Sequence, residues 1–154
     1  MEIIFFYGKT IAIKEINLFN KEDWKKRQEG LNEARTLLAE RDTKPNALDG
    51  AIWNAWRMAE YAVNAGLELL ANRTDRGHQL DKSVDELLKK KLLSRSYSKI
   101  LIQLERYRKK VEYGSYSREP SVHFNAKNVQ DCLNEVQALS DEIAAHLERM
   151  GRLP

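Results

Sequence analysis

One short stretch of this sequence combines residues whose chemistry suits a phosphate group. Arg108 is followed by Glu112 and Tyr113, and Gly114 then stops the helical pattern. A guanidinium is always charged and matches the geometry of phosphate oxygens. Residues 108–114 are therefore the first candidate for a functional site.

The position of Arg108 on its helix is unusual. It shares one face, at steps of four, three, four and three residues, with Tyr97, Leu101, Leu104 and Val111. A charged group on such an apolar face must find a partner, reach water or face another chain. One interpretation is an arginine whose stem packs on the core while its charged end reaches solvent. The other is a functional group in a cleft shared by two subunits.

Basic residues outnumber acidic residues around this position. Part of the excess is expected, because the C-terminal end of a helix favours cations. The remainder is either a phosphate-binding patch or a solvated charged face. The acidic residues are Glu105 and Glu112, and the basic residues are Arg95, Lys99, Arg106, Arg108, Lys109, Lys110 and Arg118.

The sequence lacks the other common motifs of catalytic, phosphate-binding and metal sites. It has no glycine-rich phosphate loop, no zinc-type spacing of Cys and His, and no nucleophile elbow. The histidines are scattered at His78, His123 and His146, and the spacing of Glu142 and His146 is typical of a solvated pair. Cys132 is interpreted as a small core residue. We expect neither a metal site nor a cofactor.

Helical periodicity accounts for most of the chain. Asn20 and Asn125 are predicted N-caps, and Pro45 separates the first two helices. The second helix is apolar around most of its surface, which is typical of the centre of a bundle, and its aromatic residues are interpreted as core or interface. Those aromatic residues are Trp53, Trp56 and Tyr61. The predicted helices span residues 21–41, 46–72, 79–90, 95–114 and 126–150.

The first nineteen residues differ from the rest. Two β-prone runs, 3–7 and 10–16, surround a Gly-Lys pair and predict a small hairpin that docks on the bundle or on a partner. The expected fold is all-α, a four- to five-helix up-down bundle with a short N-terminal β-hairpin-like extension. The expected division is an extension at 1–19 and a helical bundle at 20–154.

Composition narrows the class of protein. The chain has 154 residues, of which 42% are hydrophobic and 32% charged, as in a soluble globular domain rich in helix. A net charge of +3 permits a nucleic-acid partner without requiring one. The single cysteine excludes an internal disulfide framework, and no apolar run is long enough to span a membrane. We expect a cytoplasmic protein.

The run Arg108-Lys109-Lys110-Val111-Glu112-Tyr113-Gly114 at the end of a long helix resembles the HEPN domain superfamily. It is most similar to the small HEPN-like proteins that pair with minimal nucleotidyltransferases. The resemblance covers roughly residues 21–150. It implies a helical bundle that forms a homodimer, and in ribonuclease members an Arg and a His from each copy meet at the interface and cleave RNA without a metal. There the guanidinium groups neutralise the phosphate, and the His acts as acid or base.

The motif is carried over only in part. Arg108 matches the arginine, but Tyr113 stands where the histidine is expected, and Lys109 stands where an asparagine is common. A phenol exchanges protons poorly at neutral pH, so standard ribonuclease activity is in doubt. The resemblance predicts Arg108 and Tyr113 as catalytic residues if the protein is an enzyme. The predicted binding residues are Arg108, Lys109, Glu112, Tyr113 and Tyr116.

Three functional hypotheses follow from these residues. The first is a HEPN-like domain of a toxin–antitoxin or defence-type system that binds RNA, a nucleotide or a nucleotidyltransferase partner in a dimer-interface groove around Arg108. In such a system Tyr113 or Tyr116 would be the acceptor if the partner modifies a tyrosine. The second is a metal-independent endoribonuclease that uses the same groove without a histidine. The third is a non-catalytic interaction bundle in which Arg108 only bonds across a subunit interface.

Overall fold

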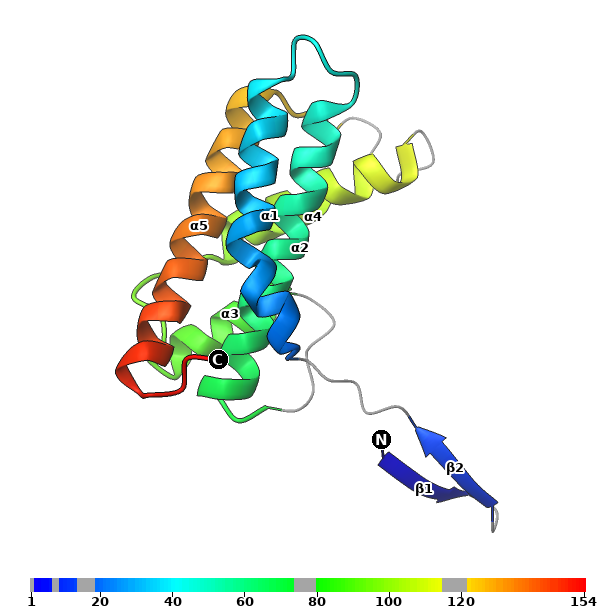
Figure 1. Cartoon of the computed structure of the whole chain (residues 1–154), viewed down its shortest axis with the longest axis vertical. Helices are drawn as coiled ribbons and strands as arrows, with labels where there is room; N and C mark the ends of the chain where they lie inside the picture. The colour runs from blue at the N-terminus through cyan, green and yellow to red at the C-terminus, as the bar shows by residue number, and fades with distance from the viewer. Residues whose placement is uncertain (1, 7–8, 14–18, 74–79, 115–121) are drawn as a thin grey trace.

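The computed structural model of the chain describes residues 2–6, 9–13, 19–73, 80–114 and 122–154. From residue 19 onward the described residues form an all-α bundle of five helices, as predicted, with one π-helical segment (Figure 1). Its helices are α1 (Lys21–Ala39), α2 (Ala47–Ala65), η1 (Gly66–Leu70), α3 (Leu80–Lys89), α4 (Ser98–Tyr113) and α5 (Ala126–Arg149).

The predicted N-caps of α1 and α5 are confirmed. The side chain of Asn20 accepts hydrogen bonds from the backbone amides of Glu22 and Asp23. Asn125 forms a capping box with Asn128, in which each side chain accepts from the other residue's amide. These bonds satisfy amides that have no partner inside the helix, so they fix where each helix begins.

Three long helices form the body of the bundle. In Figure 1, α2 runs antiparallel to α1, and α5 runs beside α1 in the opposite direction. The small residues of α2 let its neighbours approach closely, and ten of its residues are buried. A Cβ added at Gly30 of α1 would collide with the side chain of Met58 on α2, so this crossing requires a glycine.

The second predicted helix, 46–72, is not uniform. It continues from α2 into η1, where the amide of Ala71 bonds to the carbonyl of Gly66 five residues earlier. A Cβ at Gly66 would lie 3.0 Å from Leu87 of α3. The glycine thus lets α3 pack closely against this wider turn.

The start of α4 was predicted wrongly. The helix begins at Ser98 and not at residue 95, because the preceding residues bind α5. The guanidinium of Arg95 donates two hydrogen bonds to Glu135, at 2.7 and 3.0 Å. The hydroxyl of Tyr97 donates to Glu142 at 2.8 Å, and the amide of Ser94 donates to the same carboxylate. Ser94, Arg95 and Tyr97 therefore form hydrogen bonds with α5 and precede the first residue of α4.

The N-terminal residues contain two strands, β1 (Glu2–Phe6) and β2 (Lys9–Ile13). They pair antiparallel in the register that places Ile4 opposite Ile11. The prediction that residues 1–19 form an extension docked on the bundle or on a partner stays a prediction, because the side chains of this segment lie outside the described residues. Among the helices that the structure describes, none is long and apolar enough to cross a membrane.

Candidate functional site

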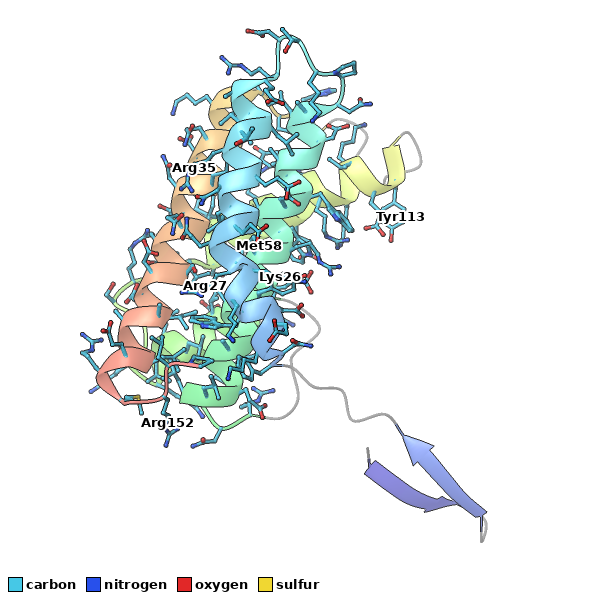
Figure 2. All side chains as sticks on the ribbon, in the orientation of Figure 1. Lys26, Arg27, Arg35, Met58, Tyr113 and Arg152 are labelled. Carbon is cyan, nitrogen blue, oxygen red and sulfur yellow. The ribbon has the colours of Figure 1, made fainter. Side chains whose placement is uncertain are left out.

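The predicted site lies at the C-terminal end of α4, which is the least enclosed part of the bundle. Figure 1 shows this end of α4 directed away from the long helices, and Figure 2 places Tyr113 at its tip. The helix is anchored at its other end, where Tyr97, Leu101 and Leu104 are buried. The apolar face predicted for α4 is confirmed at these three positions. The next member of the face is Arg108.

Arg108 is held by two contacts that leave its charge close to the surface. Its side chain is 17% exposed and pairs with the carboxylate of Glu112, one turn further along α4. The centre of its guanidinium lies 4.8 Å from the centroid of the Trp56 ring on α2. An arginine over an indole face is a favourable cation–π arrangement. The charged end of Arg108 therefore contacts Trp56 of α2 and Glu112 of α4 together.

One polar atom of Arg108 has no partner among the described residues. Its Nε is buried and makes no hydrogen bond, although nearly all buried donors in proteins make one. Leaving a buried donor unsatisfied costs about 1–3 kcal/mol. The contacts that hold Arg108 are therefore those of its charged end, and its Nε takes no part in them.

The other predicted binding residues are partly brought together. Tyr113 is 52% exposed, and Lys109 pairs with Glu105 at 3.4 Å on the outer surface of α4. Glu112 is directly bonded to Arg108. Tyr116 lies outside the described residues, so its prediction is untested. The described part of the site is a short surface of α4 with an arginine, a carboxylate and a phenol.

The histidines do not complete a ribonuclease pair within the described structure. His123 is exposed before α5, and His146 is half-buried near the end of α5, while His78 lies outside the described residues. Glu142 is bonded to Tyr97 and Ser94, so it is not free to act with His146. Among the residues that the structure covers, no group of three or more His, Cys, Asp or Glu side chains is placed to hold a metal ion.

Shifted pKa values mark the anchored end of α4. Burial, together with the hydrogen bond to Glu142, raises the pKa of Tyr97 to about 12. Burial by itself would raise the pKa of Glu142, but the hydrogen bonds from Tyr97 and Ser94 lower it overall. Both pKa shifts favour the protonated phenol of Tyr97 bonded to the ionised carboxylate of Glu142. This hydrogen bond therefore stabilises the fold.

One tryptophan of α2 contacts Arg108. Trp56 is buried, in agreement with its interpretation as a core or interface residue, but it also supports the guanidinium. Trp53, one turn before Trp56, is 37% exposed, so it is not a core residue, and its interpretation as an interface residue stays a prediction. Helical spacing alone gave no sign of the contact between Trp56 and Arg108, because it depends on how α4 crosses α2. The surface that consists of Trp56, Arg108, Glu112 and Tyr113 is called the arginine surface below.

The fold and the site together define a helical bundle that carries a charged, partly exposed site at the end of one helix. The comparison with protein families makes this more specific, since residues 22–146 match the HEPN domain. The chain belongs to the HEPN domain family. No curated protein and no solved structure matches it.

Proposed function

We propose that the arginine surface binds RNA or a nucleotide, and that the protein acts as the HEPN component of a toxin–antitoxin or defence-type system. The observation that carries this proposal is the state of Arg108. Its side chain is 17% exposed, and its charge is supported by Trp56 and countered by one carboxylate, that of Glu112, at the surface. Such a guanidinium is prepared to receive the oxygens of a phosphate.

An exposed aromatic ring on the same helix end as Arg108 favours a nucleic acid over a free inorganic anion. Tyr113 is the aromatic side chain of the arginine surface with a large exposed fraction, 52%. Bases stack on such rings with about 1–3 kcal/mol per base, while phosphates bind nearby cations. A single-stranded segment would meet both kinds of contact here.

A second copy of the chain would complete the site. Membership of the HEPN family supports dimerisation, and the arginine surface lies on the end of α4 that the rest of the bundle does not enclose (Figure 1). In a homodimer related by a twofold axis, two copies of Arg108 would line one groove. Two guanidinium groups would then hold one RNA backbone.

A nucleotidyltransferase is the protein partner that the proposal includes. Tyr113 supports it, because its phenol is half-exposed at the tip of α4 and accessible to another enzyme. Transfer of a nucleotide to this oxygen would release pyrophosphate and place a phosphodiester beside Arg108. Mass spectrometry after co-expression with such an enzyme tests this directly. Unmodified Tyr113 and Tyr116 would remove this part of the proposal.

Binding is tested with purified protein and a fluorescent single-stranded RNA, by anisotropy over a range of salt concentrations. We expect Arg108→Ala to weaken binding about tenfold or more, and Arg108→Lys to restore only part of the loss, because lysine lacks the planar stack on Trp56. Arg106→Ala, two residues earlier on the exposed side of α4, is the matched control. Equal effects of Arg106→Ala and Arg108→Ala would contradict a specific role for Arg108.

Catalysis by the same surface is the alternative that family membership favours. Incubation with total RNA or tRNA in the presence of a chelator tests it. Cleavage that Arg108→Ala abolishes and Tyr113→Phe reduces would make the protein a metal-independent ribonuclease. Binding without cleavage leaves the first proposal. If neither is seen and Arg108→Ala changes only the oligomeric state, the protein is an interaction bundle.

A further inference from the structure

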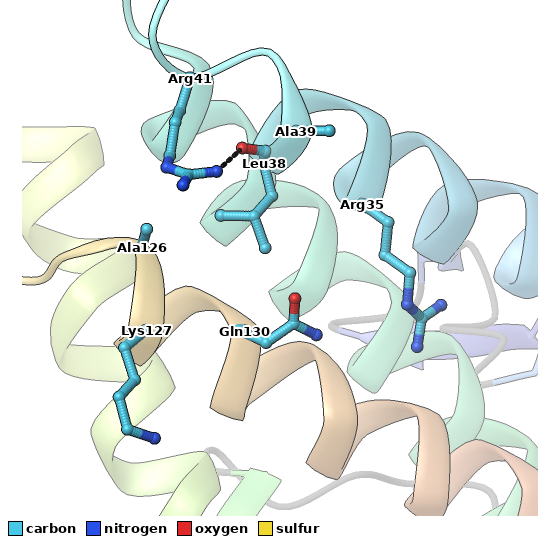
Figure 3. A pocket seen from close by; sticks show the side chains of 7 residues that line it. All are labelled: Arg35, Leu38, Ala39, Arg41, Ala126, Lys127 and Gln130. Atoms are coloured by element: carbon cyan, nitrogen blue, oxygen red, sulfur yellow. Dashed lines mark hydrogen bonds between the residues drawn. The ribbon is translucent and has the colours of Figure 1, made fainter.

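A pocket at the far end of α1 is lined by basic side chains from two helices. It lies between the C-terminal end of α1 and the N-terminal end of α5 and has a volume of about 390 Å³. Figure 3 shows Arg35 and Arg41 on one side of it and Lys127 on the other. Volumes of this size are typical of sites for small molecules. Among the described residues, no Asp or Glu side chain lines it.

The bonds of the two arginines hold them in place without neutralising them. Arg35 donates a hydrogen bond to the amide oxygen of Gln137 at 2.9 Å. Arg41 donates to the backbone carbonyl of Leu38 at 3.0 Å. Within the part of the chain that the structure covers, neither guanidinium has a carboxylate partner. Each keeps further N–H groups for another acceptor, since a guanidinium has five.

Lys127 differs from the two arginines. Its side chain is 80% exposed and pairs with Asp131, one turn along α5, at 3.2 Å. A pair this exposed contributes little and is easily exchanged for another anion. The lysine therefore adds positive charge to the rim of the pocket, while the arginines supply its directed donors.

The first two residues of α5 lie at the edge of the same pocket. Ala126 and Lys127 line it and are the first two residues of this 24-residue helix. The capping box uses the amides of Asn125 and Asn128. The amides of the two lining residues have no partner within the helix, and the positive end of the helix dipole lies here. Side chains and backbone thus present the same preference for an anion.

We infer that this pocket binds a phosphate group, and that it is a second anion site distinct from the arginine surface. Two guanidinium groups and a helix N-terminus match the several oxygens of a phosphate better than they match a carboxylate. The phosphate can belong to a free phosphate compound or to the backbone of a nucleic acid. The inference does not depend on the function proposed for Arg108.

The site is tested by following backbone amide signals by NMR while pyrophosphate is added to the full chain. We expect the amides of Ala126 and Lys127 to shift, and the double variant Arg35→Gln with Arg41→Gln to weaken binding at least tenfold. Arg152→Gln is the matched control, because Arg152 also donates to a backbone carbonyl, that of Leu69, but outside the pocket. No shift at the start of α5, or equal weakening by Arg152→Gln, would overturn the inference.

The source of the phosphate is decided by a second titration with a single-stranded RNA. If the RNA shifts the same two amides, and the double variant lowers the salt dependence of binding by about 1.4 units of slope, the ligand is a nucleic-acid backbone. If only pyrophosphate shifts them, the ligand is a free phosphate compound. Both outcomes support the pocket.

Two further variants keep the test interpretable. If the double variant does not fold, Lys127→Gln replaces it, since this side chain is mostly exposed and its loss leaves the helices intact. We then expect weaker pyrophosphate binding by about twofold to fivefold. In Arg108→Met, measured in parallel, pyrophosphate should still shift the amides of Ala126 and Lys127 to the same extent. The proposal for the pocket and the proposal for the arginine surface can therefore be contradicted independently.

Discussion

The two ends of α4 carry similar residue types but use them differently. At the first end, Arg95 lies 4.1 Å from the Tyr97 ring and binds Glu135, and Tyr97 binds Glu142. At the other end, Arg108 lies over Trp56 and binds Glu112. Both ends thus contain an arginine, an aromatic ring and a carboxylate.

The difference lies in where the carboxylates come from. Glu135 and Glu142 belong to α5, so the bonds at the first end join different helices and fix α4 to the bundle. Glu112 belongs to α4 itself, so its ion pair with Arg108 joins no second helix, and only the contact of Arg108 with Trp56 reaches α2. Hydrogen bonds and ion pairs between helices stabilise a fold, whereas an ion pair within one exposed turn contributes a few tenths of a kcal/mol. The ion pair at the second end therefore contributes little to the fold.

The largest effect should come from removing core contacts near the anchored end. Leu101 is 1% exposed, and Leu101→Ala should lower the free energy of unfolding by about 2–5 kcal/mol, because it leaves a cavity. Ile102 follows it directly and is 45% exposed, so Ile102→Ala should change this free energy by less than about 0.5 kcal/mol. Urea unfolding followed by circular dichroism measures both. Similar losses for the two variants would mean that α4 does not pack as described.

A smaller loss is expected when the bond between α4 and α5 is removed. Tyr97→Phe should lower the free energy of unfolding by about 1 kcal/mol at pH 7, the usual net value of one hydrogen bond. The same urea unfolding measurement tests this value, with Tyr113→Phe at the exposed end of α4 as the control. An equal loss in Tyr113→Phe would contradict the comparison.

The pH dependence of stability sharpens this prediction. The pKa of Tyr97 is raised from 10.0 to about 12, so the folded protein keeps a proton that the unfolded chain loses first. Its contribution is complete below pH 10 and is lost as pH rises towards 12. Cys132, whose pKa burial raises to about 12, adds a loss of the same sign in both proteins. Stability should fall less steeply above pH 10 in Tyr97→Phe than in the parent, and parallel curves would contradict the assignment.

At the exposed end, removing the charge should barely affect stability. Arg108→Met keeps an apolar stem against Trp56 and removes the unsatisfied Nε, which offsets the lost pair with Glu112. We expect the free energy of unfolding to change by less than about 1 kcal/mol, while RNA binding is lost. Thermal or urea unfolding, beside the anisotropy assay, measures this. A loss as large as that of Leu101→Ala would make Arg108 a structural residue.

The sequence predicted the parts of the fold that depend on local patterns. The caps Asn20 and Asn125, and the buried face of α4 as far as Leu104, follow from spacing along one helix. The start of α4 could not be predicted, because Tyr97 finds its partner 45 residues away on α5. Helix periodicity says which side of a helix is apolar, but not which carboxylate lies opposite.

The unusual position of Arg108 on its helix was predictable from the sequence, and the residues around it were not. Arg108 was conspicuous because it interrupts an apolar face, and that signal needs no knowledge of the fold. The contact with Trp56 and the pocket between Arg35 and Lys127 depend on helix crossings. Nothing along the chain distinguishes Trp56, which supports a charge, from an ordinary core tryptophan.

The smallest predicted effect is the most direct test of the comparison between the two ends of α4. Glu112→Gln removes the carboxylate that competes with phosphate for Arg108, so RNA affinity should rise about fivefold, or about 1 kcal/mol. Glu105→Gln is the matched control, because it changes the net charge equally but frees only Lys109. In Arg108→Met the additional change Glu112→Gln should give no gain, since the two effects act through one pair. An equal gain from Glu105→Gln, or a gain that persists without Arg108, would show that net charge alone governs binding at this end of α4.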